Sequence, residues 1–258
     1  MGVKESLDFS GKVVVVTGGA SGMGTGLAKS FAEVGADVVF TYLKHGDESE
    51  KIMEMLKSFG GRSHAICMDQ SIVEQCESMV DEVVQKMGRI DVLINNSGLH
   101  GSTESLDIER DDWDTMLNTN LRGSYFCAQY VAKQMIKQGN GGSIISISSI
   151  NSFIPLRKST HYGVSKAGMN MFTRSLAAEL GEFGIRVNAI AAGLIESPAL
   201  DVFVPGWRER YIERSPLGKT GLPSDIGNIC IFLASPMSAW ITGQTIVADG
   251  GVLLAPAF

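Results

Sequence analysis

Short runs of apolar, largely β-branched residues alternate along this chain with longer stretches of helical character. The apolar runs fall at 12–17, 37–42, 62–67, 90–95, 142–148, 185–190 and 245–248, and helical stretches lie between them. Short runs that are apolar throughout predict strands buried on both faces of a parallel sheet. Regular alternation with helices predicts right-handed crossovers. We therefore expect an α/β protein with a doubly wound parallel sheet of about seven strands and helices on both faces.

The composition supports one globular domain over residues 1–258. Apolar residues make up 44% and charged residues 19%, with 22 Lys and Arg against 28 Asp and Glu, a net charge of −6. No linker rich in Pro, Gly or Ser divides the chain, and single α/β domains often reach this length. A mildly acidic chain argues against a general nucleic-acid binder, which is expected to carry net positive charge.

The four cysteines lie at 67, 76, 127 and 230, too far apart for a zinc motif. The histidines are scattered, so we expect no metal site. No apolar run reaches the roughly 18 residues of a membrane span. The first ten residues lack the apolar core of a signal peptide. These observations favour a cytoplasmic protein without a membrane partner.

A glycine-rich turn directly follows the first predicted strand. Residues 17–24 read TGGASGMG, which places Gly18, Gly22 and Gly24 between a strand and a helix. Glycines allow a backbone to approach a pyrophosphate closely, and a helix N-terminus attracts phosphates. We expect this turn, including Ser21 and Met23, to bind a dinucleotide. The alternative is a tight turn that needs glycine for its geometry alone.

Tyr162 and Lys166 form the pattern Y-x-x-x-K on a predicted helix. Side chains four residues apart lie on one helix face, and an ammonium beside a phenol is expected to lower the pKa of the phenol. Such a tyrosine can exchange a proton with a carbonyl oxygen. Ser149 lies thirteen residues before Tyr162, at the end of the fifth predicted strand, with Ser148 as the competing hydroxyl.

Asn120 lies inside the long predicted helix 110–138, where asparagine is unfavourable, so we expect a local irregularity or a functional hydrogen bond there. Asn118 is the alternative. The glycine turn and the set Asn120, Ser149, Tyr162 and Lys166 together resemble the short-chain dehydrogenase/reductase family in its classical form, from about residue 9 to 251. The resemblance implies a Rossmann-type fold. It also implies hydride transfer between a nicotinamide and a ketone or secondary alcohol, with these four residues catalytic and Tyr162 as general acid/base.

The same resemblance suggests further cofactor contacts. The sequence NNSG supplies Asn96 and Gly98, Asp69 is expected to face the adenine, and the turn after the sixth strand supplies Gly193, Ile195 and Ser197. Tyr42 closes the second strand where an acidic residue would select NAD, and Lys44 follows it. We therefore favour NADP over NAD.

Substrate identity is expected to reside in a lid at about 196–215, which contains Trp207. His100 and His161 are most simply interpreted as loop or surface histidines, with substrate contact as the alternative. A 3-oxoacyl-carrier-protein reductase is one competing function, although Asn140 and Phe183 are not the basic residues expected for an acidic carrier. A non-catalytic cofactor-sensing protein is another. The resemblance implies a homotetramer, with helices 110–138 and 160–181 as interface candidates and a small carbonyl or alcohol compound as substrate.

Overall fold

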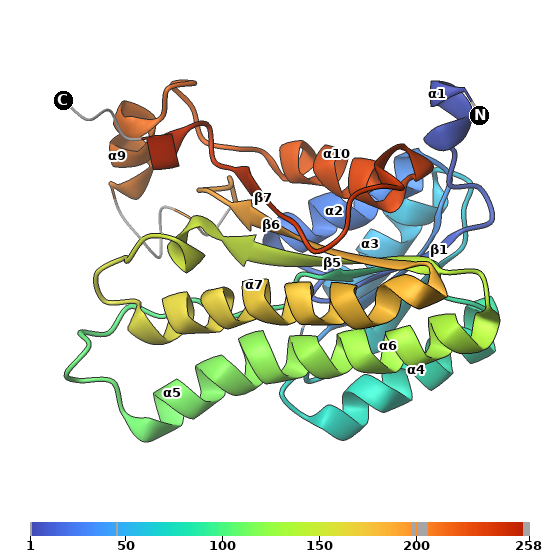
Figure 1. Cartoon of the computed structure of the whole chain (residues 1–258), viewed down its shortest axis with the longest axis horizontal. Coiled ribbons are helices and arrows are strands. Elements are labelled where there is room, and N and C mark those ends of the chain that lie inside the picture. Colours follow the sequence, from blue (N-terminus) through green and yellow to red (C-terminus); the bar gives the residue numbers. More distant parts are fainter. Residues whose placement is uncertain (1, 45, 198–199, 201–205, 255–258) are drawn as a thin grey trace.

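Seven parallel strands form one sheet in the order β3-β2-β1-β4-β5-β6-β7 (Figure 1). The computed structural model describes residues 2–44, 46–197, 200 and 206–254. This sheet, with helices on both faces, confirms the predicted α/β class and strand number. The strands are β1 Val13–Val16, β2 Asp37–Tyr42, β3 Ser63–Cys67, β4 Val92–Asn95, β5 Gly142–Ser149, β6 Ile185–Ala192 and β7 Thr245–Ala248.

The helices cover the sheet in two layers (Figure 1). Helices α2 (Gly22–Glu33), α3 (Gly46–Lys57) and α10 (Pro223–Ala234) pack on one face. Helices α4 (Val73–Met87), α6 (Ser124–Gln138) and α7 (Thr160–Leu180) pack on the other. Shorter helices are α1 (Val3–Ser6), α5 (Arg110–Leu117) and α9 (Trp207–Arg214).

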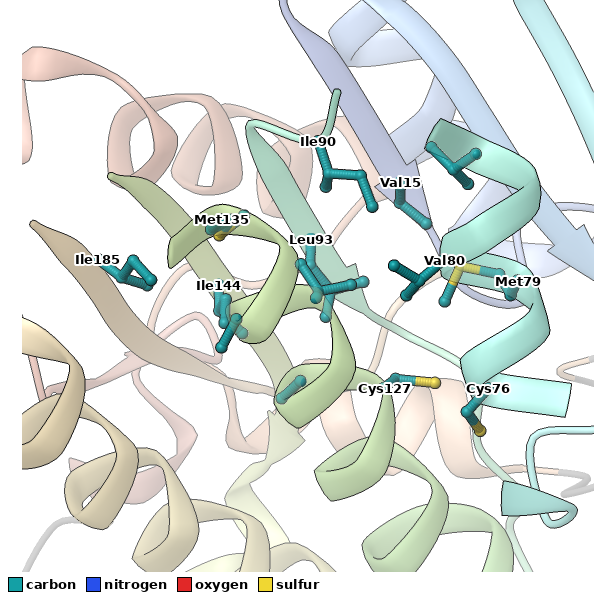
Figure 2. Packing of buried hydrophobic residues seen from close by; sticks show 14 of the residues in the cluster. Val15, Cys76, Met79, Val80, Ile90, Leu93, Cys127, Met135, Ile144 and Ile185 are labelled. Carbon is teal, nitrogen blue, oxygen red and sulfur yellow. The ribbon is translucent and has the colours of Figure 1, made fainter. Parts of the chain in front are cut away.

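Strands β1 to β6 each supply residues to both halves of the hydrophobic core. In β1, Val13 and Val15 pack toward α4 and α6, whereas Val14 and Val16 pack toward α2 and α10. All four are at most 1% exposed, which is why the sequence shows an unbroken apolar run rather than an alternating one. Figure 2 shows the half of the core that lies between the sheet and helices α4, α6 and α7. There, Leu93 and Ile144 of the sheet lie against Val80 and Met135 of the helices.

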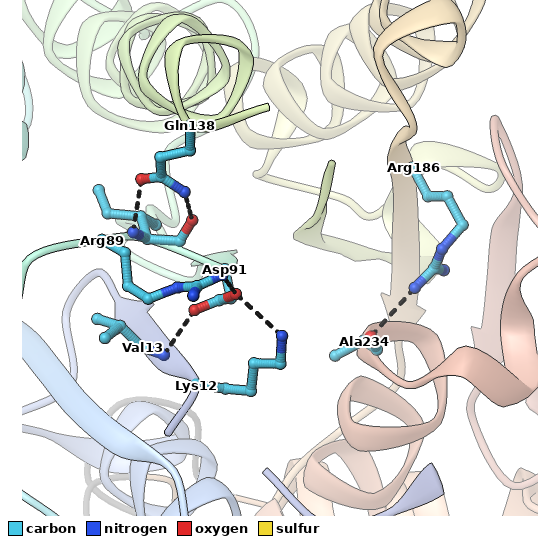
Figure 3. Close-up of polar contacts among 8 residues, drawn as sticks. Lys12, Val13, Arg89, Asp91, Gln138, Arg186 and Ala234 are labelled. Atoms are coloured by element: carbon cyan, nitrogen blue, oxygen red, sulfur yellow. Dashed lines mark hydrogen bonds and ion pairs between the residues drawn. The ribbon is translucent and has the colours of Figure 1, made fainter. Parts of the chain in front are cut away.

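The strand order reverses beside β1, because β2 and β3 lie on one side of it and β4 to β7 on the other. Ligands of doubly wound sheets bind at such a point, outside the carboxyl ends of the strands. At the opposite end the start of β4 is fastened to β1: Asp91 accepts a hydrogen bond from Val13 N at 3.0 Å and pairs with Lys12 and Arg89 (Figure 3). A ligand-binding site is therefore expected at the carboxyl ends of β1 and β4.

Arg186 of β6 fastens the end of α10 to the sheet. Its guanidinium donates to the carbonyl oxygen of Ala234 at 3.1 Å (Figure 3). It also donates to the carbonyl oxygen of Leu233 at 2.6 Å and to Ser238 Oγ at 2.7 Å. Burial lowers the pKa of this group. The arginine shares this helix end with the hydroxyls of Ser143 and Ser238, which also donate to the carbonyl oxygen of Leu233.

We expect Arg186→Ala to lower the free energy of unfolding by about 2–3 kcal/mol, since it removes hydrogen bonds to the carbonyls of Leu233, Ala234 and Ser235. Urea unfolding followed by circular dichroism measures the change. Arg174→Ala, an exposed arginine on α7, is the matched control and should change stability by less than about 0.5 kcal/mol. Equal stability of the two variants would contradict a stabilising role for Arg186.

Candidate active site

Tyr162 and Lys166 lie in the first turns of α7, one turn apart. The lysine is 4% exposed, and its Nζ donates to the carbonyl oxygen of Ile147 in β5 at 2.8 Å. The same Nζ lies 5.7 Å from the centroid of the Tyr162 ring. Burial lowers the pKa of Lys166 to about 8. The helix spacing and the sheet together thus hold an ammonium against the tyrosine ring.

The side chains of the neighbouring residues Ser148 and Ser149 of β5 have different surroundings. Ser149, the last residue of the strand, lines the same cleft as Tyr162; its hydroxyl donates to Asn151 Oδ1 at 3.1 Å and accepts from Asn151 N at 3.1 Å. Ser148 instead donates to the main-chain oxygen of Lys166 at 3.3 Å. Successive side chains of a strand point to opposite faces, so one hydroxyl meets the tyrosine and the other meets helix backbone. The structure therefore brings Ser149, and not the oxygen of Ser148, to the phenol.

The acidity of Tyr162 differs from the sequence-based expectation. Burial raises the pKa of Tyr162, and the hydrogen bond from Ser149 opposes this only in part. The expected net lowering of this pKa is wrong for the protein alone, because burial of the phenol outweighs the interactions that favour its phenolate. The phenol therefore remains protonated at neutral pH, which suits it to give a proton to an oxygen.

Asn120 lies within a π-helix, Asn118–Gly123, that interrupts the helix between α5 and α6. Its side chain is fully buried: Oδ1 accepts from Leu99 N at 2.7 Å and Nδ2 donates to Leu99 O at 2.8 Å. The alternative, Asn118, is half-buried. The predicted irregularity of the long helix is thus present, and Asn120 uses it to hold the loop that follows β4.

Packing explains why the helix widens here. A Cβ at Gly123 would overlap the carbonyl of Gln70, so only glycine fits at this position. Gln70 in turn donates to the carbonyl of Thr119 at 3.0 Å, within the π-helix. Such single-turn π segments often occur at functional sites.

The glycine turn after β1 has the shape of a phosphate cradle. Gly18 and Gly22 take positive φ values of 65° and 53°, and α2 begins at Gly22. A Cβ at Gly24 would overlap the Gly18 carbonyl, whereas a Cβ at Gly22 would meet open space. Ser21 occupies the N-cap position without a side-chain cap bond, so the first N–H groups of α2 are available. The turn therefore fits the pyrophosphate of a dinucleotide.

Asn96 has a structural role beside this turn. Its Nδ2 donates to the carbonyls of Thr17 at 2.9 Å and Gly18 at 3.2 Å. The end of β4 is thereby tied to the end of β1, across the reversal point of the sheet. Asn95 makes a comparable bond, from Nδ2 to the carbonyl of Ser124 at 2.9 Å.

A cleft of about 360 Å³ joins the glycine turn to Tyr162. It lies where the carboxyl ends of β4, β5 and β6 meet the start of α2, and His100 also faces it. Among the residues singled out from the sequence, ten line this cleft: Gly22, Met23, Asn96, Gly98, Ser149, Tyr162, Lys166, Gly193, Ile195 and Ser197.

The other singled-out residues lie around the cleft without lining it. Gly18, Ser21 and Gly24 belong to the glycine turn, and Asn120 lies behind Leu99. The three residues expected at the adenine end, Tyr42, Lys44 and Asp69, follow the ends of β2 and β3. Tyr42 is half-buried and Lys44 exposed, while the Asp69 carboxylate accepts from Ser71 N at 2.9 Å.

The lid is described in part. Residues 198–199 and 201–205 lie outside the described residues, whereas Glu196, Ser197 and α9 are described. Arg208 of α9 donates to Glu196 at 2.6 Å, which lowers the pKa of that carboxyl together with Thr220. The Tyr211 hydroxyl donates to Asp249 O at 2.6 Å and fills the space beside Gly193 that a Cβ would take.

One of the two histidines differs from its simplest interpretation, whereas His100 is an exposed loop residue as expected. His161 is 2% exposed and packs on Gly101, so it is a core residue rather than a surface one. His100 lines the cleft with its ring against Tyr162. No sequence spacing distinguishes the buried histidine from the one that lines the cleft. Their positions depend on how the loops after β4 and β5 pack together. In the described part of the chain no three His, Cys, Asp or Glu side chains gather as metal ligands, and no helix is long and apolar enough to cross a bilayer.

Comparison with known proteins places this geometry in a family. A family model described as enoyl-(acyl carrier protein) reductase, of the short-chain alcohol dehydrogenase type, matches residues 18–253. The chain is 38% identical over 250 residues to a 3-oxoacyl-[acyl-carrier-protein] reductase of Thermotoga maritima, covering 95% of this chain and 99% of that protein. It is 39% identical over 252 residues to an L-rhamnose-1-dehydrogenase of Scheffersomyces stipitis, with 95% and 97% covered.

Solved structures agree with these sequence matches. A short-chain type dehydrogenase/reductase from Mycobacterium marinum superposes with a TM-score of 0.90 at 31% identity, covering 98% of this chain and 99% of that one. The match thus extends over the sheet, the cleft and both helix layers. The chain belongs to the short-chain dehydrogenase/reductase family and is a nicotinamide-dinucleotide-dependent oxidoreductase acting on CH–OH and C=O groups.

Proposed function

We propose that the chain, acting as one catalytic domain over residues 1–258, interconverts a ketone and a secondary alcohol with NADP(H). The observation that carries this proposal is the convergence of Ser149, Tyr162 and Lys166 on the cleft that begins at the glycine turn. When bound, the cofactor supplies or accepts a hydride at its nicotinamide. The remaining steps fall to the side chains of the protein.

Tyr162 gives its phenolic proton to the substrate oxygen during reduction and takes it back during oxidation. Its raised pKa keeps it protonated in the reductive direction. Ser149, which lines the cleft with Tyr162, orients the same oxygen and stabilises charge that develops there. The Lys166 ammonium, held by Ile147, stabilises the phenolate that forms after proton transfer. Asn120 keeps the loop at Leu99 in place beside this proton path.

Screening tests this function directly. Purified protein is incubated with NADPH or NADH and a panel of ketones, and with NADP⁺ or NAD⁺ and the matching alcohols, while absorbance of the reduced cofactor is followed. Reduction of at least one ketone with production of its alcohol is the expected result. Binding of a cofactor without turnover of any ketone or alcohol would instead favour a cofactor-sensing protein.

The preference for NADP rests on the end of β2. Tyr42 carries no charge that would repel a 2′-phosphate, and exposed Lys44 follows two residues later. A lysine there attracts phosphate as a point charge.

We expect NADPH to bind more tightly than NADH in a fluorescence titration, and Lys44→Ala to weaken NADPH binding about three- to fivefold, the value of one exposed charge pair. NADH binding should stay unchanged. Lys51→Ala, another exposed lysine on α3, is the control and should alter neither affinity. Tighter binding of NADH by the parent protein would refute the interpretation of Tyr42 and Lys44.

Reduction of a 3-oxoacyl group on a carrier protein is the second candidate, favoured by the similarity to the Thermotoga maritima reductase. Against it, the two positions compared with carrier-docking residues are Asn140 and Phe183, both exposed and uncharged. An acidic carrier would also meet a chain with a net charge of −6. We therefore prefer a small carbonyl or alcohol compound as the substrate. A free 3-oxoacyl thioester is included in the screen to test the alternative.

A homotetramer in the cytoplasm is the assembly that we propose. Helices α6 and α7 expose apolar side chains, among them Met171 at 59% and Val164 at 43% exposure, beside an aromatic row formed by Tyr125, Phe126 and Tyr130. Exposed apolar side chains on neighbouring helices are typical of protein–protein contacts. The four cysteines are unpaired thiols, which suits a reducing compartment.

A further inference from the structure

His100 lies beside the tyrosine of the active site, on the loop that follows β4. It lines the same cleft as Ser149 and Tyr162. Its ring meets the Tyr162 ring edge-on, with centroids 4.8 Å apart and planes at 63°. On its other side is the Trp207 ring of α9, at 6.1 Å and 86°. The histidine therefore stands between the tyrosine and the lid helix.

The backbone on both sides of His100 is fixed. Leu99 donates its N–H to Asn120 at 2.7 Å and accepts from the same amide at 2.8 Å. Gly101 accepts a hydrogen bond from Ser159 Oγ at 3.1 Å, and His161 packs so closely that a Cβ at Gly101 would meet it at 2.8 Å. A side chain mounted between two such anchors is held in one place before a ligand arrives, as a recognition residue needs to be.

His100 is an exposed residue, and its ring nitrogens have no hydrogen-bond partner among residues 2–44, 46–197, 200 and 206–254. Burial, with a smaller contribution from His161, lowers the pKa of His100 below its ordinary value. The imidazole is therefore neutral at pH 7, with one donor and one acceptor nitrogen. Both functions are open to a ligand in the cleft.

Several other polar side chains of the cleft wall already have partners within the protein. The Glu196 carboxylate is held by Arg208, the Lys166 ammonium by Ile147, and the Ser148 hydroxyl by the main chain of α7. His100 is thus a polar group next to Tyr162 that the protein itself leaves unsatisfied. A polar group in that position favours substrates that satisfy it over those that do not.

We propose that His100 recognises a second oxygen of the substrate, on the carbon next to the one that is oxidised or reduced. Building on the proposed function, this assigns the substrate to α-hydroxy ketones and the corresponding vicinal diols, including cyclic polyols and sugars. Tyr162 and Ser149 hold the reacting oxygen, and the neighbouring oxygen then lies toward the imidazole that stacks on Tyr162.

Matched ketone pairs test the assignment. The parent protein and its variants are assayed with 3-hydroxy-2-butanone against 2-butanone, and with 2-hydroxycyclohexanone against cyclohexanone. His100→Phe keeps an aromatic ring against Tyr162 and Trp207 but removes both nitrogens. His100→Gln restores a donor and an acceptor. His64→Phe makes the same exchange at a histidine of β3 that pairs with Glu82, away from the cleft.

The parent is expected to prefer the hydroxylated member of each pair in kcat/KM. His100→Phe should reduce this preference on the order of ten- to a hundredfold, the loss of a hydrogen bond within a site built for it. His100→Gln should recover part of the preference, and His64→Phe should retain all of it. Thermal unfolding of each variant separates a folding defect from a change of specificity.

Three results would overturn the assignment. A parent protein without preference for the hydroxylated ketones, an unchanged preference in His100→Phe, or an equal fall for both members of a pair would each assign His100 a packing role only. All three leave the proposed function standing, because ketones are still reduced. If the parent reduced none of the four ketones or any other compound of the screen, the proposed function itself would fail.

Discussion

Replacing Tyr162 by Phe is expected to lower kcat for ketone reduction by about 10²–10⁴-fold, the usual contribution of a positioned general acid. The exchange removes the only atom that gives a proton to the substrate in the proposed reaction. It keeps the ring that packs on His100 and lies under Lys166. Affinity for the cofactor should therefore change little, and steady-state rates combined with a cofactor titration separate the two effects.

Tyr130→Phe is the matched control for this experiment. Tyr130 lies half-buried on α6, outside the cleft, and its loss of a hydroxyl should leave kcat within about twofold of the parent. If Tyr162→Phe kept the parent's turnover, the catalytic role of the tyrosine would be refuted. If the biological activity of the protein survived without turnover, the cofactor-sensing alternative would gain support.

The parts of the site that depend on local spacing could be predicted from the sequence. Gly18, Gly22 and Gly24 follow a strand and begin a helix, and Tyr162 and Lys166 are one helix turn apart, so their geometry follows from the elements that carry them. The strand pattern likewise determined the sheet, since β1 is buried on both faces along its whole length.

Features that depend on packing between residues far apart in the chain were harder to predict from the sequence. The sequence suggested an irregular helix at Asn120, but its π form follows from the contact between Gly123 and Gln70, which are far apart in the chain. The pKa of Tyr162 was wrongly expected to fall, because the helix spacing places Lys166 near the ring without showing how deeply the phenol is buried. His100 and His161 look alike in sequence, and only the packing of their loops separates them.

Lys166 shows how a site residue can oppose the stability of the fold. Its pKa is 10.5 in an ordinary setting and about 8 when buried here. Below about pH 8 the amine is protonated in both the folded and the unfolded chain, so the full cost of burying the charge is present. Between 8 and 10.5 the unfolded chain binds more protons than the folded one, and stability therefore rises with pH across that window.

Lys166→Met should therefore have opposite effects on stability and activity. At pH 7 the variant avoids burying a charge, worth about 3 kcal/mol, and loses the bond to Ile147, worth about 1 kcal/mol, for a net stabilisation of about 2 kcal/mol. This advantage should shrink as the pH is raised toward 10.5, as urea unfolding at several pH values will measure. Turnover should fall about 10²–10³-fold, because the phenolate of Tyr162 loses its stabilising charge.

Lys57→Met, an exposed lysine at the end of α3, controls for the exchange itself and should show neither effect. A Lys166→Met variant less stable than the parent at pH 7 would mean that the buried ammonium contributes to the fold through Ile147 by more than its burial removes. A stability difference independent of pH would mean that Lys166 titrates near its ordinary pKa. If turnover were also lost, either result would still support a role for the lysine in the reaction. It would contradict the expectation that burying the ammonium lowers the free energy of unfolding.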